Sequence, residues 1–110
     1  MKQIKAIVID PFSQQIYDKK IGQDHLPDMQ EIVGGHIESA GTFDNGDVLF
    51  VNEKGLFEHG LKFFRVRNER FIPQQELAGV GFVLGHDEEG AGQDAGMSDL
   101  DLAMKVEWVE

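Results

Sequence analysis

The stretch that decides the fold reads Ile4-Lys5-Ala6-Ile7-Val8-Ile9-Asp10-Pro11. Side chains of an extended chain alternate between two faces, and this stretch is apolar on both of them. A strand of that kind is typical of the interior of a sheet that is covered on both sides. Because proline cannot donate a hydrogen bond to a neighbouring strand, Pro11 is expected to end it. The sequence therefore predicts a central, doubly covered strand over residues 4–10.

The rest of the chain shows the short alternating patterns and turn residues of a small sheet. We expect further strands near residues 15–20, 36–40, 48–51, 61–66, 80–84 and 106–108. Asn45-Gly46 indicates a tight turn, because this pair tolerates positive φ. Tight turns join antiparallel neighbours, so the strands are expected to be mostly antiparallel.

Helix signals occur at two places. Pro27 suits a first helical turn, and Gly34 suits the left-handed cap at the end of a helix. Ser98 resembles the N-cap of a second helix of about one turn. The sequence therefore predicts an α+β fold, with a small, mostly antiparallel sheet of about five to six short strands and one or two short helices.

One domain is expected over residues 1–110, since no linker or internal repeat divides the chain. Residues 85–97 combine four glycines with four acidic residues. Such a composition is typical of a solvated connection rather than a packed element. We therefore expect a mobile, acidic, glycine-rich loop over about residues 85–97.

The charge of the chain is negative and unevenly placed. The formal net charge is −10; residues 1–75 carry 11 acids and 9 bases, whereas residues 76–110 carry 9 acids and 1 base. Binding to a phosphate backbone needs clusters of Lys and Arg, so a nucleic-acid partner is disfavoured. An acidic surface suits a protein partner, in particular a basic one.

The absence of cysteine excludes disulfides, zinc fingers, iron–sulfur sites and a cysteine nucleophile. It also agrees with a reducing compartment. Residues 6–9 are the longest apolar stretch near the start, shorter than a signal peptide or a membrane helix requires. We therefore expect a cytoplasmic protein without a membrane partner.

Candidate catalytic and metal-binding residues are few. His36 and Glu38 have the H-x-E spacing of zinc deaminases, but such sites need cysteine ligands to complete the metal shell. The other histidines have no recognisable ligand spacing; they are His25, His59 and His86. The glycines of residues 79–85 have the wrong spacing for a dinucleotide loop and suggest a bulge or close packing. We predict no catalytic residue, metal or cofactor, and treat enzymatic activity as doubtful.

Two segments are candidates for an interaction surface. Asp87, Glu88 and Glu89 form an acidic run beside His86. On a strand, Phe63, Arg65 and Arg67 would share one face, which could serve as a platform for a phosphate or a base. The same arginines could instead form ion pairs with the acidic last third of the chain. Both roles stay open at this point.

The order of several segments resembles a family of small uncharacterised proteins, with a domain of unknown function, that phages, plasmids and integrated mobile elements encode. The segments that carry the resemblance are residues 7–11, 32–38, 45–55 and 77–85, which begin with Ile7-Val8-Ile9-Asp10-Pro11. It spans roughly residues 4–90, and the part from about residue 91 has no clear counterpart. The resemblance implies a mobile element in a bacterial host, and it implies no activity and no functional residues.

The leading hypothesis is a non-enzymatic interaction protein of a mobile genetic element, whose acidic surface contacts a protein partner. One alternative is a small-ligand or nucleotide binder with a pocket near His36, Glu38 and the strand at residues 79–85. Another is a nucleic-acid contact through Phe63, Arg65 and Arg67. Self-association through an exposed strand edge also remains open.

Overall fold

The computed structural model of the chain describes residues 1–55 and 61–109. Its elements are, in chain order, β1 (Gln3–Asp10), β2 (Gln15–Gly22), α1 (Leu26–Val33), β3 (Ile37–Thr42), β4 (Val48–Asn52), β5 (Phe63–Val66), β6 (Leu77–Ala78), β7 (Gly81–His86), β8 (Gly92–Gln93), α2 (Asp99–Lys105) and β9 (Val106–Val109). The predicted α+β fold with a mostly antiparallel sheet is confirmed.

Strand β1 lies inside the larger of two sheets, as its sequence predicts. The strand order is β2-β1-β7-β4-β3, and β8 pairs with the end of β7. Each of these pairs is antiparallel. The polar strand β2 forms one edge of the sheet, where its side chains meet water.

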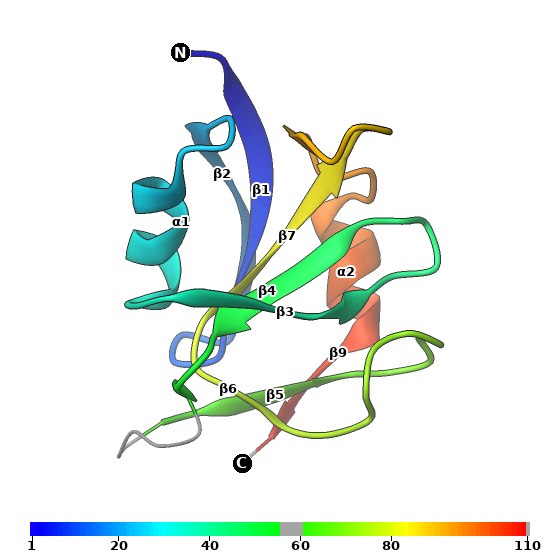
Figure 1. Cartoon of the computed structure of the whole chain (residues 1–110). Coiled ribbons are helices and arrows are strands. Elements are labelled where there is room, and N and C mark those ends of the chain that lie inside the picture. Colours follow the sequence, from blue (N-terminus) through cyan, green and yellow to red (C-terminus); the bar gives the residue numbers. More distant parts are fainter. Residues whose placement is uncertain (56–60, 110) are drawn as a thin grey trace.

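The two faces of β1 belong to two separate cores. Ile4 and Ala6 pack in a cluster with residues of α1, whereas Ile7 and Ile9 pack in a second cluster with residues of β5 and α2. Helix α1 therefore covers one face of the larger sheet. The smaller sheet and α2 cover the other, which gives three layers (Figure 1).

The smaller sheet has the order β6-β5-β9. Its middle strand β5 places Phe64 and Val66 in the second core. The segments near residues 61–66 and 106–108 are strands, as predicted, but they pair with each other rather than with the larger sheet. Only tertiary pairing decides between these partners, so the division into two sheets is not visible in the local pattern.

Both helices begin or end at the residues that the sequence indicates. Gly34 closes α1 with φ 77°, and Pro27 lies in its first turn. The Ser98 hydroxyl accepts a hydrogen bond from the N–H of Asp101 at 3.1 Å and so caps α2. No helix in the described ranges is long and apolar enough to cross a membrane.

Residues 85–97 contain more regular structure than the expected loop. Strand β7 runs to His86, and β8 turns back to pair with it. The segment is also joined to the sheet by the N–H of Ala95, which donates to the carbonyl of Lys5 at 2.9 Å. Whether the hairpin moves stays a prediction, but its backbone has defined partners.

Candidate functional site

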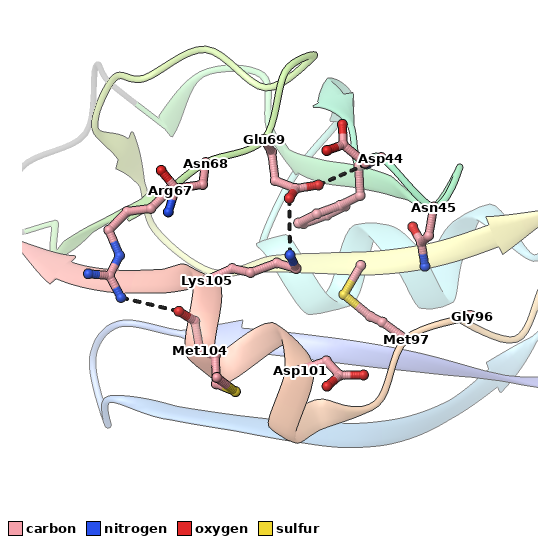
Figure 2. A pocket seen from close by; sticks show the side chains of 11 residues that line it. Asp44, Asn45, Arg67, Asn68, Glu69, Gly96, Met97, Asp101, Met104 and Lys105 are labelled. Atoms are coloured by element: carbon pink, nitrogen blue, oxygen red, sulfur yellow. Dashed lines mark hydrogen bonds and ion pairs between the residues drawn. The ribbon is translucent and has the colours of Figure 1, made fainter.

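A pocket of about 580 Å³ opens where the two sheets and α2 meet. We call it the junction pocket. Its walls come from the turn between β3 and β4, the loop that follows β5, and α2 with the residues before it, as Figure 2 shows. Phe43, Met97 and Met104 supply apolar surface, and the other side chains around it are charged or amides.

A buried carboxylate forms one wall of the junction pocket. The Glu69 side chain is 4% exposed, and its Oε2 lies 3.0 Å from the Nζ of Lys105. Its Oε1 accepts the N–H of Asp44 at 2.8 Å. A buried charge needs such partners. Glu69 therefore fixes three walls of the pocket to one another (Figure 2).

A second buried carboxylate, that of Asp47, binds the backbone of two residues that line the pocket, Gly96 and Met97. Its oxygens accept the N–H of Gly96 at 3.0 and 2.9 Å and the N–H of Met97 at 3.1 Å. The Nδ2 of Asn45 donates to the same carboxylate at 3.0 Å. These bonds attach the segment before α2 to the turn between β3 and β4. Hydrogen bonds to Asp47 thus connect two of the segments that line the pocket.

Of the three residues proposed as a platform, Phe63 and Arg65 lie on the face of β5 opposite the buried Phe64 and Val66, and Arg67 follows the strand. Arg67 lies beyond β5 and lines the junction pocket, where its Nη2 donates to the carbonyl of Met104 at 3.2 Å. Arg65 instead pairs with Glu107 at 2.9 Å and with Glu76 at 3.5 Å. Phe63 is half-buried at the start of β5. The pairing of Arg65 favours an internal role over contact with phosphate.

The acidic run lies in the turn of the β7–β8 hairpin. The Oδ1 of Asp87 accepts the N–H groups of Glu89 and Ala91, both at 2.9 Å. The hydrogen bond from the N–H of Ala91 has the largest effect on the pKa of Asp87 and lowers it below its ordinary value. Desolvation partly opposes this shift, and the hydrogen bond from Glu89 adds a smaller lowering effect. Asp87 therefore organises the turn, while the side chains of Glu88 and Glu89 are exposed.

His36 and Glu38 lie at the beginning of β3, an edge strand of the larger sheet. Both are exposed, and His36 precedes β3 with its Nδ1 3.5 Å from the Nε2 of Gln30. Ile37, between them, packs against the core on the α1 side. Because strand residues alternate, Glu38 points away from that side. In residues 1–55 and 61–109, no three His, Asp or Glu side chains gather as metal ligands; His59 lies outside the described residues.

The strand at residues 79–85 does border a pocket, on the α1 face of the larger sheet. This α1-side pocket of about 270 Å³ is lined by Asp24, Met29, Val48, Phe50, Leu84, Gly85, His86, Gly90 and Gly92. Neither residue of the predicted His36–Glu38 site contributes to it. This pocket therefore lies at the His86 end of the strand, and a pocket near His36 and Glu38 stays a prediction.

Helix α2 presents two large apolar side chains to solvent. Leu100 is 74% exposed and Met104 is 77% exposed. Residues four apart lie on the same face of a helix, so the two side chains are neighbours. Asp101, which lines the junction pocket, is exposed next to them. This apolar pair with its adjacent carboxylate was not singled out in the sequence, although the spacing within the predicted helix could have revealed it.

Glu69, Asp47 and Lys105 were also not singled out from the sequence. Their partners lie far along the chain; the Asp47–Met97 bond spans 50 residues and the Glu69–Lys105 bond 36. No local pattern indicates such a pairing.

Together, the fold and the pockets define an acidic α+β domain with two antiparallel sheets and an open pocket between them. The sequence profile of DUF3846, a domain of unknown function, matches residues 4–105. The chain therefore belongs to the DUF3846 family. No curated protein and no solved structure matches it.

The extent of the family match corrects one expectation. The resemblance in the sequence ends near residue 90 and predicts no counterpart for the rest of the chain. The match continues to residue 105 and so includes β8 and α2. The segment that forms one wall of the junction pocket is thus part of the family's domain.

Proposed function

We propose that this chain is a non-enzymatic interaction protein of a mobile genetic element, and that its acidic surface contacts a protein partner. The observation that carries the proposal is the exposed pair Leu100 and Met104 beside the junction pocket. Exposed apolar side chains that gather beside a pocket mark contact surfaces more often than isolated ones do. The partner's side chains would cover this pair and enter the pocket.

The junction pocket is lined by three acids and two bases, and two of the acids lie outside its Glu69–Lys105 ion pair, which supports a basic partner. Asp44 and Asp101 line the junction pocket, and within the described residues neither carboxylate accepts a bond from another charged side chain. A segment that carries an apolar residue next to a Lys or Arg would complement both the apolar pair and these acids.

The remaining acids favour fast association with such a partner. Glu88 and Glu89 are exposed at the tip of the hairpin, and the whole chain carries −10. Exposed charges of one sign steer an oppositely charged partner during diffusion, and salt screens this attraction. These residues would therefore act on the association rate rather than on the contact itself.

A bacterial cytoplasm and a mobile element are the setting that the resemblance implies, and the lack of cysteine agrees with a reducing compartment. Nucleic acid is the less favoured partner, because Arg65 is neutralised by two acids of the same chain. Self-association is the remaining alternative, since β2 and β3 end the larger sheet on either side.

The test is capture of a host protein by the immobilised chain from bacterial lysate, with three forms of the protein compared. The double variant Leu100→Ala, Met104→Ala should lose the captured protein. The control variant Phe12→Ala, Leu26→Ala removes two other exposed apolar side chains and should keep it. Capture that is equal for all three forms, or no capture at any salt concentration, would overturn the proposal.

Kinetics with the identified partner would separate contact from steering. Leu100→Ala, Met104→Ala should raise the dissociation rate, whereas Glu88→Gln, Glu89→Gln should lower the association rate and its dependence on salt. Light scattering across the same variants tests self-association. If the wild-type chain forms a dimer and the variant Leu100→Ala, Met104→Ala is a monomer, the partner is a second copy of this chain and not a different protein.

A further inference from the structure

The α1-side pocket lies between α1 and the loop before it, strands β4 and β7, and the β7–β8 hairpin. Met29 is the helix residue at its wall, and Val48, Phe50 and Leu84 of the strands form its floor. The Phe50 ring stacks on the ring of Phe82, with centroids 5.2 Å apart and 21° between the planes. Because Phe82 is fully buried, this stacking holds Phe50 in place. The pocket therefore has a fixed apolar floor.

Asp24 places a carboxylate at the rim of this floor. Its Oδ1 accepts the N–H of Gly92 at 2.9 Å, which connects the loop before α1 to β8. No other hydrogen bond reaches the carboxylate from residues 1–55 or 61–109, so its Oδ2 is available to a ligand. The backbone of Asp24 has φ 53°, a left-handed conformation that Asp and Asn tolerate better than most residues.

His86 supplies a second acceptor. Its Nδ1 lies 3.1 Å from the carbonyl oxygen of Asp87. A carbonyl oxygen can only accept, so this contact assigns a hydrogen to Nδ1, and in the tautomer without a hydrogen on Nε2 that nitrogen is an acceptor. The two ionisable side chains that line the pocket thus both offer acceptors. The described lining contains no Lys or Arg.

We propose that the α1-side pocket binds a small organic ammonium compound with a compact apolar body. The apolar body would lie on Phe50 and Leu84, and the ammonium group would donate to Asp24 and His86. In a mostly apolar pocket, a few polar groups fix the orientation of a ligand when they are complementary to the polar groups of that ligand. The volume of about 270 Å³ suits a ligand smaller than a typical drug.

The same lining disfavours the nucleotide that the sequence left as an alternative. A nucleotide would bring its phosphates toward the Asp24 carboxylate, with no cation in the described lining to pair with them. The inference is independent of the proposed function, because this pocket and the junction pocket lie on opposite faces of the larger sheet.

The test is an NMR titration of the ¹⁵N-labelled chain with matched probes. 2-Phenylethylamine carries the ammonium, 2-phenylethanol is its neutral counterpart, and phenylacetate is the anion. We expect the amine to bind about tenfold more tightly than the alcohol, since hydrogen bonds to charged groups are the stronger ones. Phenylacetate should not bind, and the shifts should centre on Phe50, Leu84 and Gly92.

Two variants and one further probe complete the experiment. Asp24→Asn keeps the acceptor for Gly92 and tolerates the left-handed backbone, so it should remove the preference for the amine and leave alcohol binding unchanged. Asp44→Asn, in the junction pocket, is the control and should bind like the wild type. Equal affinity for all three probes, or a preference that survives Asp24→Asn, would overturn the proposal. Tighter binding of Nα-acetyl-lysine amide than of phenylethylamine would also overturn it, in favour of a protein side chain.

Discussion

Glu69 and Lys105 form an ion pair that joins the loop after β5 to the last turn of α2, with 3.0 Å between Nζ and Oε2. The Glu69 side chain is 4% exposed and that of Lys105 35%. The other oxygen of Glu69 accepts the N–H of Asp44 from the turn between β3 and β4. One carboxylate therefore connects three separate segments around the junction pocket.

Removal of Lys105 should leave the Glu69 carboxylate buried without its cation. We expect Lys105→Met to lower the free energy of unfolding by about 2 kcal/mol, less than for a fully buried pair because the ammonium group is partly solvated. With Glu69→Gln, a double-mutant cycle should give a coupling energy of about 1 kcal/mol or more. Urea denaturation at neutral pH measures both values.

The matched control for this cycle is the more exposed pair Arg65–Glu107, whose side chains are 33% and 42% exposed. A cycle of Arg65→Met and Glu107→Gln should give a coupling energy well below about 1 kcal/mol, since water screens the pair. If both cycles gave the same coupling energy, burial of Glu69 would not be what makes its pair strong.

Asp47 should be among the polar residues most important for stability. Asp47→Ala leaves the N–H groups of Gly96 and Met97 without their acceptor. We expect a loss of about 2 kcal/mol in the free energy of unfolding, because the buried N–H of Met97 would keep its full desolvation penalty, whereas the exposed Gly96 can bind water instead. Asp44→Ala, in the same turn but exposed, should change it by less than about 0.5 kcal/mol. Similar losses in the two variants would contradict this role.

The sequence predicts those parts of the fold that depend on neighbours along the chain. The alternation in residues 4–10 indicates both faces of β1 correctly, because side-chain direction in a strand follows from the backbone alone. Gly34 and Ser98 mark helix ends for a similar reason, since each cap acts within a few residues. Local geometry is therefore sufficient to predict the structure at all of these positions.

The candidate site could not be predicted in the same way, because distant segments assemble it. The turn that contains Asp47 is clear from Asn45-Gly46, yet the bond to Met97 spans 50 residues. The partners of Arg65 depend on the register that places it opposite Glu107, which no local pattern specifies. The sequence left two roles open for Arg65, and only the pairing of β5 with β9 favours one of them.

Gly81 should be intolerant of a side chain. A Cβ atom there would lie 3.0 Å from the carbonyl oxygen of Phe50 and 3.1 Å from the Phe64 ring. The close packing that the glycines suggested is therefore present at this position. We expect Gly81→Ala to lower the free energy of unfolding by about 2 kcal/mol, as overpacking in a filled core does. Ser39→Ala on the exposed edge strand is the control; an equal effect of both substitutions would count against close packing.

The pH dependence of stability should depend in part on Asp87. Hydrogen bonds from the N–H groups of Ala91 and Glu89 hold its pKa in the folded chain below the value in the unfolded chain. A depressed pKa stabilises the fold above the unfolded value of about 3.9, and this contribution is lost as the pH falls through the folded value. Asp87→Asn keeps an oxygen acceptor for the turn but removes the charge. The variant should therefore be less stable than the wild type at pH 7, and the difference should shrink as the pH falls below about 4.

The comparison must be made between variant and wild type at each pH, because Asp28 titrates in the same direction. The N–H of Gly22 lowers the pKa of Asp28, with a smaller contribution from His25. Wild-type stability therefore falls in acid for more than one reason, and only the difference between the two proteins isolates Asp87. Glu88→Gln, one residue further along the turn, is the control and should be about as stable as the wild type at pH 7, because no hydrogen bond to its carboxylate is seen within residues 1–55 and 61–109. A difference for Asp87→Asn that stays constant from pH 7 into acid would show that the turn needs the shape of Asp87 and not its charge.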